Sequence, residues 1–167
     1  MISMHDASIP VFKRFLTNLS TILDKAVVYA DAKGIEHSTL LVARLYPDMY
    51  PLTKQVQIAT DMSKGGAARL AGVEMPKYED NETSFAELQE RIAKTLAFLD
   101  TIKPEQLVGS ESRNISITVR GRQLEFKGQQ YLLNWVQPNL YFHVTTAYNI
   151  LRHNGLELGK PDYLAGM

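Results

Sequence analysis

The sequence predicts an all-α protein, a four-helix bundle with a small β-hairpin inserted before the last helix. Two observations carry this prediction. Four long segments place apolar residues at steps of three and four, which is the period of a helix that buries one face. One short stretch, residues 115–126, instead alternates apolar and polar residues, as strands do. With 167 residues, the chain is expected to form a single domain over residues 1–167, large enough for a full core.

The first helix is expected over residues 6–33, with a cap at Asp6 or Ser8 and an end at Gly34. Residues 35–52 follow as a connection that is too apolar for an ordinary loop, so we expect it to pack back over the helices. The apolar stripe of the first helix consists of Phe12, Phe15, Leu16, Leu19, Ile22, Leu23, Ala26, Val27 and Ala30.

The second and third helices are expected over residues 52–71 and 84–102. A glycine pair at 65–66 weakens the second helix by about 1 kcal/mol per glycine relative to alanine. We therefore expect another helix to pack closely there, the alternative being the approach of a ligand. Ser84 and Glu87 have the spacing of a capping box, which predicts the start of the third helix.

The hairpin of residues 115–126 is expected to turn at Arg120-Gly121. Because an isolated hairpin is marginally stable in water, we expect it to lie on the helices or at a subunit contact. The last helix is expected over residues 128–154, with a kink at Pro138. Its predicted buried stripe consists of Leu133, Val136, Leu140, Val144, Ala147 and Leu151.

The charge balance and the amino-acid composition argue against several classes of partner. The chain has 18 basic and 18 acidic residues, whereas a nucleic-acid-binding protein needs a clearly basic surface. There is no cysteine, so disulfides, thiolate ligands and a cysteine nucleophile are excluded. No apolar stretch approaches the roughly 18 residues of a membrane span, and the N-terminus lacks the pattern of a signal peptide. We therefore expect a cytoplasmic protein with neither nucleic acid nor membrane as a partner.

Three polar residues form the candidate site. His143 lies on the shoulder of the last helix's stripe, and Asn139 lies one turn earlier on the same shoulder. On the second helix, Gln55 is expected to face the interior, whereas Gln57 falls on the outward side. Imidazole is a good ligand for zinc, nickel or iron, but a carboxamide oxygen is a poor one. These residues therefore predict either a buried hydrogen-bonded cluster or a weak metal site.

Aromatic residues gather near the same segments. Tyr46 and Tyr50 lie in the connection before the second helix, and Trp135, Tyr141 and Tyr148 lie on the last helix. Tyrosines in such positions bury the ring and keep the hydroxyl paired. They pack either in the core or as the walls of a ligand pocket.

Three stretches, together with the spacing between them, cover nearly the whole chain: "MHDASIPVFKRFLTNLSTILDKA", "ARLYPDMYPLTKQVQIATDMSKGGAARLAG" and "FHVTTAYNILRHNGLELGKPDYL". They resemble the DinB/YfiT-like superfamily, and most closely a bacterial branch of it described only as a domain of unknown function. This resemblance implies the same four-helix fold.

The resemblance also implies a divalent-metal site of three histidines, one from the second helix and two, spaced HxxxH, from the last. His143 matches the second histidine of that pair, and Asn139 stands at the first. The second-helix position falls on Gln55 or Gln57, and the helical wheel favours Gln55. Because one ligand of three is retained, we expect a degenerate site without a cofactor. Zinc or nickel bound at His143 is the alternative.

Three functions are open on these grounds. The first is binding of a small molecule in a polar pocket near Gln55, Asn139 and His143, with Tyr46 and Tyr50 as walls. The second is a divalent-metal-dependent transferase or hydrolase.

That second function needs a rebuilt set of ligands that adds a carboxylate such as Asp48 to His143. The third function is a non-catalytic, dimeric interaction or stress-related protein. A homodimer is expected because related bundles pair and because the hairpin and helix edges offer apolar surface.

Overall fold

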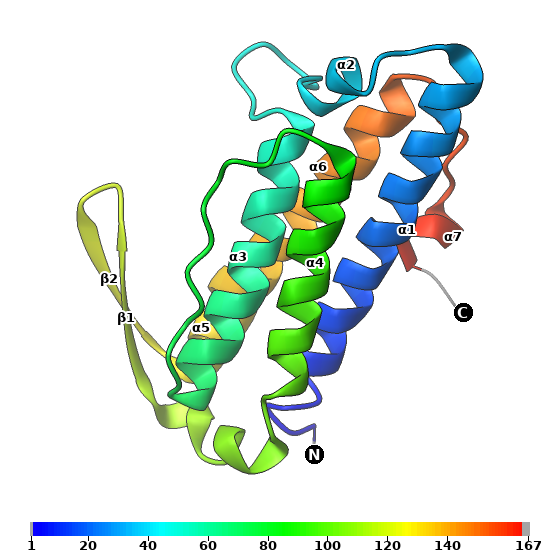
Figure 1. Ribbon diagram of the computed structural model, residues 1–167. Helices are drawn as coiled ribbons and strands as arrows, with labels where there is room; N and C mark the ends of the chain where they lie inside the picture. Colours follow the sequence, from blue (N-terminus) through cyan, green and yellow to red (C-terminus); the bar gives the residue numbers. More distant parts are fainter. Residues whose placement is uncertain (1, 165–167) are drawn as a thin grey trace.

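The computed structural model describes residues 2–164 and shows four long helices side by side (Figure 1). They are α1 (Ile9–Lys33), α3 (Leu52–Ala71), α4 (Phe85–Asp100) and α6 (Gln137–His153). Together they enclose one apolar core, and a two-stranded hairpin precedes the last helix. The predicted all-α architecture with an inserted hairpin is thereby confirmed. No helix within the described residues has the length and apolarity to span a membrane.

The ends of the helices follow local sequence signals. Ser84 and Glu87 form the predicted capping box of α4, since each side chain bonds to the backbone N–H of the other. Gly34 ends α1 in the left-handed conformation, with φ 62°. The start of α1 was predicted too early, because residues 4–7 form turns and Ser8 donates to the Met4 carbonyl instead of capping the helix.

The connection between α1 and α3 packs back onto the helices as predicted. It contains α2 (His37–Leu41), which lies across one end of the bundle (Figure 1). Leu40 and Leu41 of this helix are buried in the core. At the opposite end, two short 3₁₀ turns, η1 (Pro104–Leu107) and η2 (Ser110–Ser112), lead from α4 to the hairpin.

The glycine pair in α3 marks a close helix contact, as expected. A Cβ atom added at Gly66 would lie 2.7 Å from the Cγ1 of Val136 and 3.4 Å from the ring of Phe12. Only a residue without a side chain therefore lets the segment before α6 approach α3 this closely. At Gly65 the nearest atom is the end of the Arg69 side chain, which is flexible.

The hairpin consists of β1 (Asn114–Val119) and β2 (Arg122–Lys127), paired antiparallel. Arg120 and Gly121 both have positive φ, 49° and 77°, which is the geometry of a tight two-residue hairpin turn. The apolar face of β1 is buried, and Phe126 of β2 packs its ring on Tyr131 and Trp135. The hairpin thus lies against the segment that leads into α6.

That segment is not the continuous α-helix that the sequence predicted. It contains α5 (Gly128–Tyr131), a π-helical turn η3 (Leu132–Val136) and then α6. The backbone N–H of Gln137 donates to the carbonyl of Leu132, five residues back. The wider turn shifts the buried face by one residue, so Leu132 is buried while Leu133 is 46% exposed. The placement of Leu133 in the stripe was therefore wrong.

Pro138 lies in the first turn of α6, directly after the π turn. A proline there has no N–H to donate to the preceding turn, and the π turn accommodates this break in the hydrogen-bond ladder. After α6 the chain turns back and ends the described region in α7 (Lys160–Leu164). This helix packs on α1, where Asn18 donates to the Tyr163 carbonyl over 2.8 Å.

Candidate functional site

Gln55 and His143 meet across the interface of α3 and α6. Gln55 lies in the first turn of α3, and His143 lies in the middle of α6. The Oε1 of Gln55 is 2.7 Å from the Nδ1 of His143, and both side chains are buried. The sequence-based pairing of these two residues therefore agrees with the geometry.

The hydrogen bonds of Gln55 and His143 determine which nitrogen of the imidazole carries the proton. The Nε2 of Gln55 donates to the Tyr50 carbonyl over 2.9 Å, so its Oε1 is the atom that faces the imidazole. An amide oxygen only accepts, and Nδ1 of His143 must therefore carry the proton. Burial lowers the pKa of His143 from 6.5 to about 4, which keeps the ring neutral. The lone pair of His143 is thus on Nε2.

Asn139 does not join this pair. Its Nδ2 donates to the Trp135 carbonyl one turn earlier, over 2.7 Å, and among residues 2–164 it has no hydrogen bond to Gln55 or His143. An asparagine inside a helix commonly bonds to the carbonyl four residues back. The predicted cluster of three is therefore a pair, with Asn139 in a neighbouring groove.

Three further placements differ from the sequence-based expectation. Tyr46 and Tyr50 are 67% and 51% exposed, and Tyr50 contributes its backbone carbonyl to the site and not its ring. Gln57 was expected to face outward but is buried. The chain between α3 and α4 covers it, and its Nε2 donates to Glu82 over 2.8 Å.

We call the neighbouring hollow the hairpin groove. It lies between α3, the segment from α5 into α6, and strand β1, and has a volume of about 630 Å³. One wall comes from α3, a second from the π turn and its neighbours, and the hairpin covers the third side. Its lining residues are Ile58, Asp61, Met62, Arg69, Ile117, Thr118, Val119, Arg120, Tyr131, Trp135 and Asn139.

The groove follows the antiparallel course of its two helices. Tyr131, Trp135 and Asn139 are spaced four residues apart on one side, and Arg69 lies opposite Tyr131 with a 3.2 Å hydrogen bond. Ile58 lines the groove from the first half of α3, close in sequence to Gln55. The groove therefore runs from the Arg69–Tyr131 contact toward the α3 turn that holds Gln55.

A charged cluster borders the groove at Asp61. The buried guanidinium of Arg91 lies 2.8 Å from Asp61 and 2.8 Å from Glu82, and Lys64 also contacts Asp61 at 2.8 Å. Burial raises the pKa of Glu82, but its hydrogen bonds with Arg91 and Gln57 outweigh this and hold it below the usual value. The carboxylate of Asp61 is therefore already neutralised by two cations. This network ties the chain between α3 and α4 to both helices.

The contacts of these residues do not match the metal site implied by the family resemblance. Nδ1–H of His143 donates a hydrogen bond to the Oε1 of Gln55, and the amide of Asn139 donates to a carbonyl of its own helix. Asp48, the carboxylate expected in a rebuilt site, is exposed. The described part of the chain contains no group of three or more His, Asp or Glu side chains arranged to hold a metal ion. The donor set does not fit a transition metal, because a single imidazole nitrogen is left.

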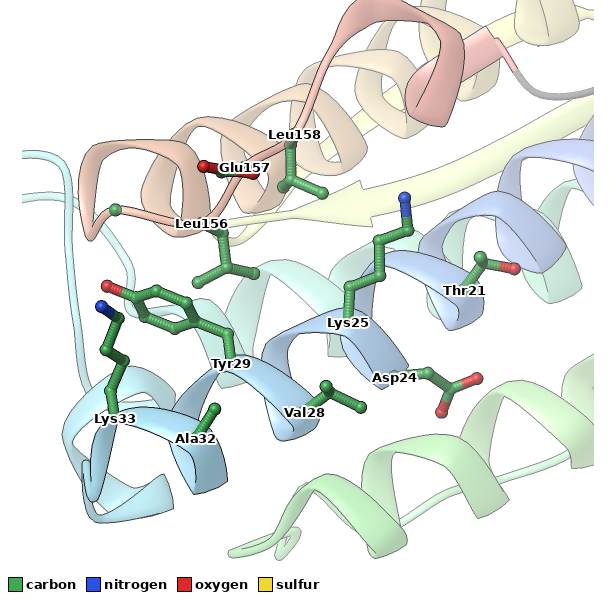
Figure 2. Close-up of a pocket in the computed structure, with 11 residues that line it drawn as sticks. Thr21, Asp24, Lys25, Val28, Tyr29, Ala32, Lys33, Leu156, Glu157 and Leu158 are labelled. Carbon is green, nitrogen blue, oxygen red and sulfur yellow. The ribbon is translucent and has the colours of Figure 1, made fainter.

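A second hollow, of about 610 Å³, lies between α1 and the chain after α6 (Figure 2). Several of its polar side chains are bonded to residues outside the hollow. Lys25 pairs with Asp162, and the hydroxyl of Tyr29 donates to the Asn154 carbonyl over 3.1 Å. Val28 on its edge is exposed. We place the candidate site in the hairpin groove, where the half-buried guanidinium of Arg69 has no carboxylate partner among residues 2–164.

Sequence reasoning missed the groove residues Arg69, Tyr131 and Trp135 as a set. Part of the signal was present, because Ile58, Met62 and Arg69 lie on one face of a helical wheel. The other wall depends on the π turn, which the apolar pattern does not show.

Comparisons with known proteins agree with the geometry of the fold. A family model described as a domain of unknown function, DUF1993, matches residues 4–164. Among solved structures, the chain is similar to a DinB family member protein from Shewanella denitrificans, with 41% identity and a TM-score of 0.90. That match covers 98% of this chain and 93% of the other. A comparison with the curated proteins gave no match.

Proposed function

Since the chain belongs to the DUF1993 family of DinB-like proteins, we propose that it binds a small molecule in the hairpin groove, without a metal ion. In this proposal the buried Gln55–His143 pair stands where the family resemblance implies a histidine site. In this proposal the pair supports the wall of the groove, and the ligand contacts the residues around Trp135.

The observation that carries the proposal is the groove itself. Its volume of about 630 Å³ lies within the range of small-molecule sites, roughly 300–1,000 Å³. Its lining combines apolar side chains with a few polar groups from three separate elements, which is the usual composition of such a site. An indole, a phenol and a guanidinium face the same space.

Trp135 provides a direct readout, because it is the only tryptophan of the chain and lines the groove. Octanoate, octanamide and octylamine serve as probes with one apolar body and three different charges. Under the proposal, at least one of them changes the emission of Trp135 with saturation. If none does, and none raises the melting temperature, the proposal is wrong.

A pair of matched variants locates the binding. Ile58→Tyr adds bulk inside the hairpin groove, and Val28→Tyr adds bulk in the second hollow (Figure 2). The first is expected to weaken binding of the probe at least tenfold, whereas the second leaves it unchanged. The opposite result would place the ligand between α1 and the chain after α6.

The cytoplasmic location and the homodimer expected from the sequence remain parts of this proposal. Three exposed apolar side chains gathered on the connection before α3 support a homodimer, since apolar surface that is contiguous marks a protein–protein contact. They are Val42, Tyr46 and Tyr50.

A further inference from the structure

We infer that the ligand of the hairpin groove carries a carboxylate, which binds at Arg69 and Tyr131 while its apolar body lies along Trp135. This inference rests on the proposed function. It assigns a chemical class to the ligand and an orientation along the groove.

Arg69 is the first observation. It is half-buried in α3, and within residues 2–164 no ion pair joins it to a carboxylate. Its contacts are the hydroxyl oxygen of Tyr131 at 3.2 Å and the sulfur of Met75 at 4.0 Å. An arginine has five N–H donors, and a phenol oxygen and a thioether satisfy few of them. A guanidinium in this state matches the forked geometry of a carboxylate.

Tyr131 is the second observation. Only 2% of its surface is exposed, and its oxygen accepts from Arg69, so its own O–H is still available as a donor. Burial raises the pKa of Tyr131, and the phenol therefore keeps its proton. A nearly buried hydroxyl without an acceptor is costly unless a ligand or water supplies one. It lies beside the arginine that lacks an anion.

Along the groove, hydrogen-bond donors outnumber acceptors, and this also favours a carboxylate on the ligand. The indole N–H of Trp135 has no acceptor among the described residues, and Arg120 at the hairpin turn has no acidic partner there. The one carboxylate that lines the groove, Asp61, is held by Arg91 and Lys64. Donors are therefore in excess, and the free charge of the groove is positive.

The order of the lining residues along the groove determines the orientation of the ligand. Asp61 and Arg69 are eight residues apart on α3, or about 12 Å at the rise of an α-helix. Between these two ends lie Met62 and Trp135, and strand β1 covers them with apolar side chains. An amphipathic monocarboxylate fits this arrangement, with the charged end at Arg69. A cation at that end would face a guanidinium without compensation.

The test compares the three probes on the full-length protein by Trp135 fluorescence. Octanoate is expected to bind at least about tenfold more tightly than octanamide, which is the effect of one or two hydrogen bonds to a charged group. Arg69→Gln removes this difference, and Tyr131→Phe reduces it. Arg14→Gln, at an exposed arginine on α1 away from the groove, keeps it.

The outcomes separate this inference from the proposed function. Three results would contradict the carboxylate but not the proposed ligand binding. They are equal binding of octanoate and octanamide, tighter binding of octylamine, and an unchanged preference for octanoate in Arg69→Gln. If no probe changes the emission of Trp135 and none raises the melting temperature, both the inference and the proposed function are wrong. If circular dichroism shows that Arg69→Gln does not fold, Arg69→Lys replaces it. The lysine keeps the charge without the fork, so an intermediate preference supports the inference and an unchanged one contradicts it.

Discussion

The Oε1 of Gln55 lies 2.7 Å from the Nδ1 of His143 across the interface of α3 and α6, and both side chains are buried. The amide nitrogen of Gln55 is bonded to the Tyr50 carbonyl, so the chain before α3 is part of the same contact. Two helices and a loop therefore depend on one imidazole–amide pair. The Nδ1–H of His143 and the amide oxygen of Gln55 satisfy each other, as polar groups inside a core must.

His143→Ala is expected to destabilise the protein by about 1–3 kcal/mol, because it leaves the buried oxygen of Gln55 without a donor. Urea unfolding followed by circular dichroism measures this free energy. His153→Ala, at an exposed position near the end of the same helix, is the control and should change it little. A double variant with Gln55→Leu should recover part of the loss. Equal stability of His143→Ala and the wild type would contradict the contact.

The free energy of unfolding is expected to decrease when the pH is lowered, because of His143. In the folded state burial lowers its pKa to about 4, whereas the unfolded value is near 6.5. Between these values the unfolded chain takes up a proton that the folded chain does not, so the free energy of unfolding decreases as pH decreases. The free energy of unfolding is unaffected by this titration above pH 6.5, and up to about 3 kcal/mol is lost as the pH falls to about 4.

The measurement is urea unfolding at a series of pH values for the wild type and for His143→Gln. The variant lacks the titrating ring and should lose the slope between about pH 6.5 and 4 that is due to it. Carboxylates such as Glu82 contribute a separate slope at lower pH, which both proteins share. Identical slopes in the two proteins would show that His143 is not the group responsible.

Purified protein is expected to contain no tightly bound transition metal, because one imidazole nitrogen and engaged amides make a weak donor set. Elemental analysis of wild type and His143→Ala should give the same low content of zinc, nickel and iron. Near-stoichiometric metal in the wild type that disappears in His143→Ala would restore the metal-dependent transferase or hydrolase.

The protein is expected to form a homodimer, so light scattering should give about twice the chain mass of 18.8 kDa at micromolar concentration. Tyr46→Glu places a charge on the exposed connection before α3 and should shift the mass toward the monomer. Val108→Glu, at a side chain of similar exposure directly after η1 and before the hairpin, is the control. A monomeric wild type would rule out this prediction.

The sequence predicted the features that depend on neighbouring residues. Glycine in the left-handed conformation ends α3 at Gly72, and the capping box begins α4, so these boundaries were close to the prediction. The Gln55–His143 pair was also predictable, because it needs only the inner face of two helices. Gln57 was placed wrongly, since the loop that buries it is invisible to a helical wheel.

The hairpin groove could not be predicted in the same way. Its lining comes from residues that are about 60 positions apart, such as Arg69 and Tyr131, and their contact depends on how the helices pack. The π turn is a tertiary effect as well, because it lets Val136 fit against Gly66 while Phe126 packs on Trp135. A periodic pattern that assumes 3.6 residues per turn misplaces every residue before such a turn.

The π turn lies between α5 and α6, and it changes the angle at which side chains project from the helix axis. Residues after it keep the angular setting that the core requires, whereas Tyr131 and the residues before it are rotated by one position. An insertion or deletion of a single residue at this point would therefore re-aim the groove wall and the hairpin without disturbing α6. The number of residues in this turn, more than their identity, therefore sets the direction in which the groove wall faces relative to α6.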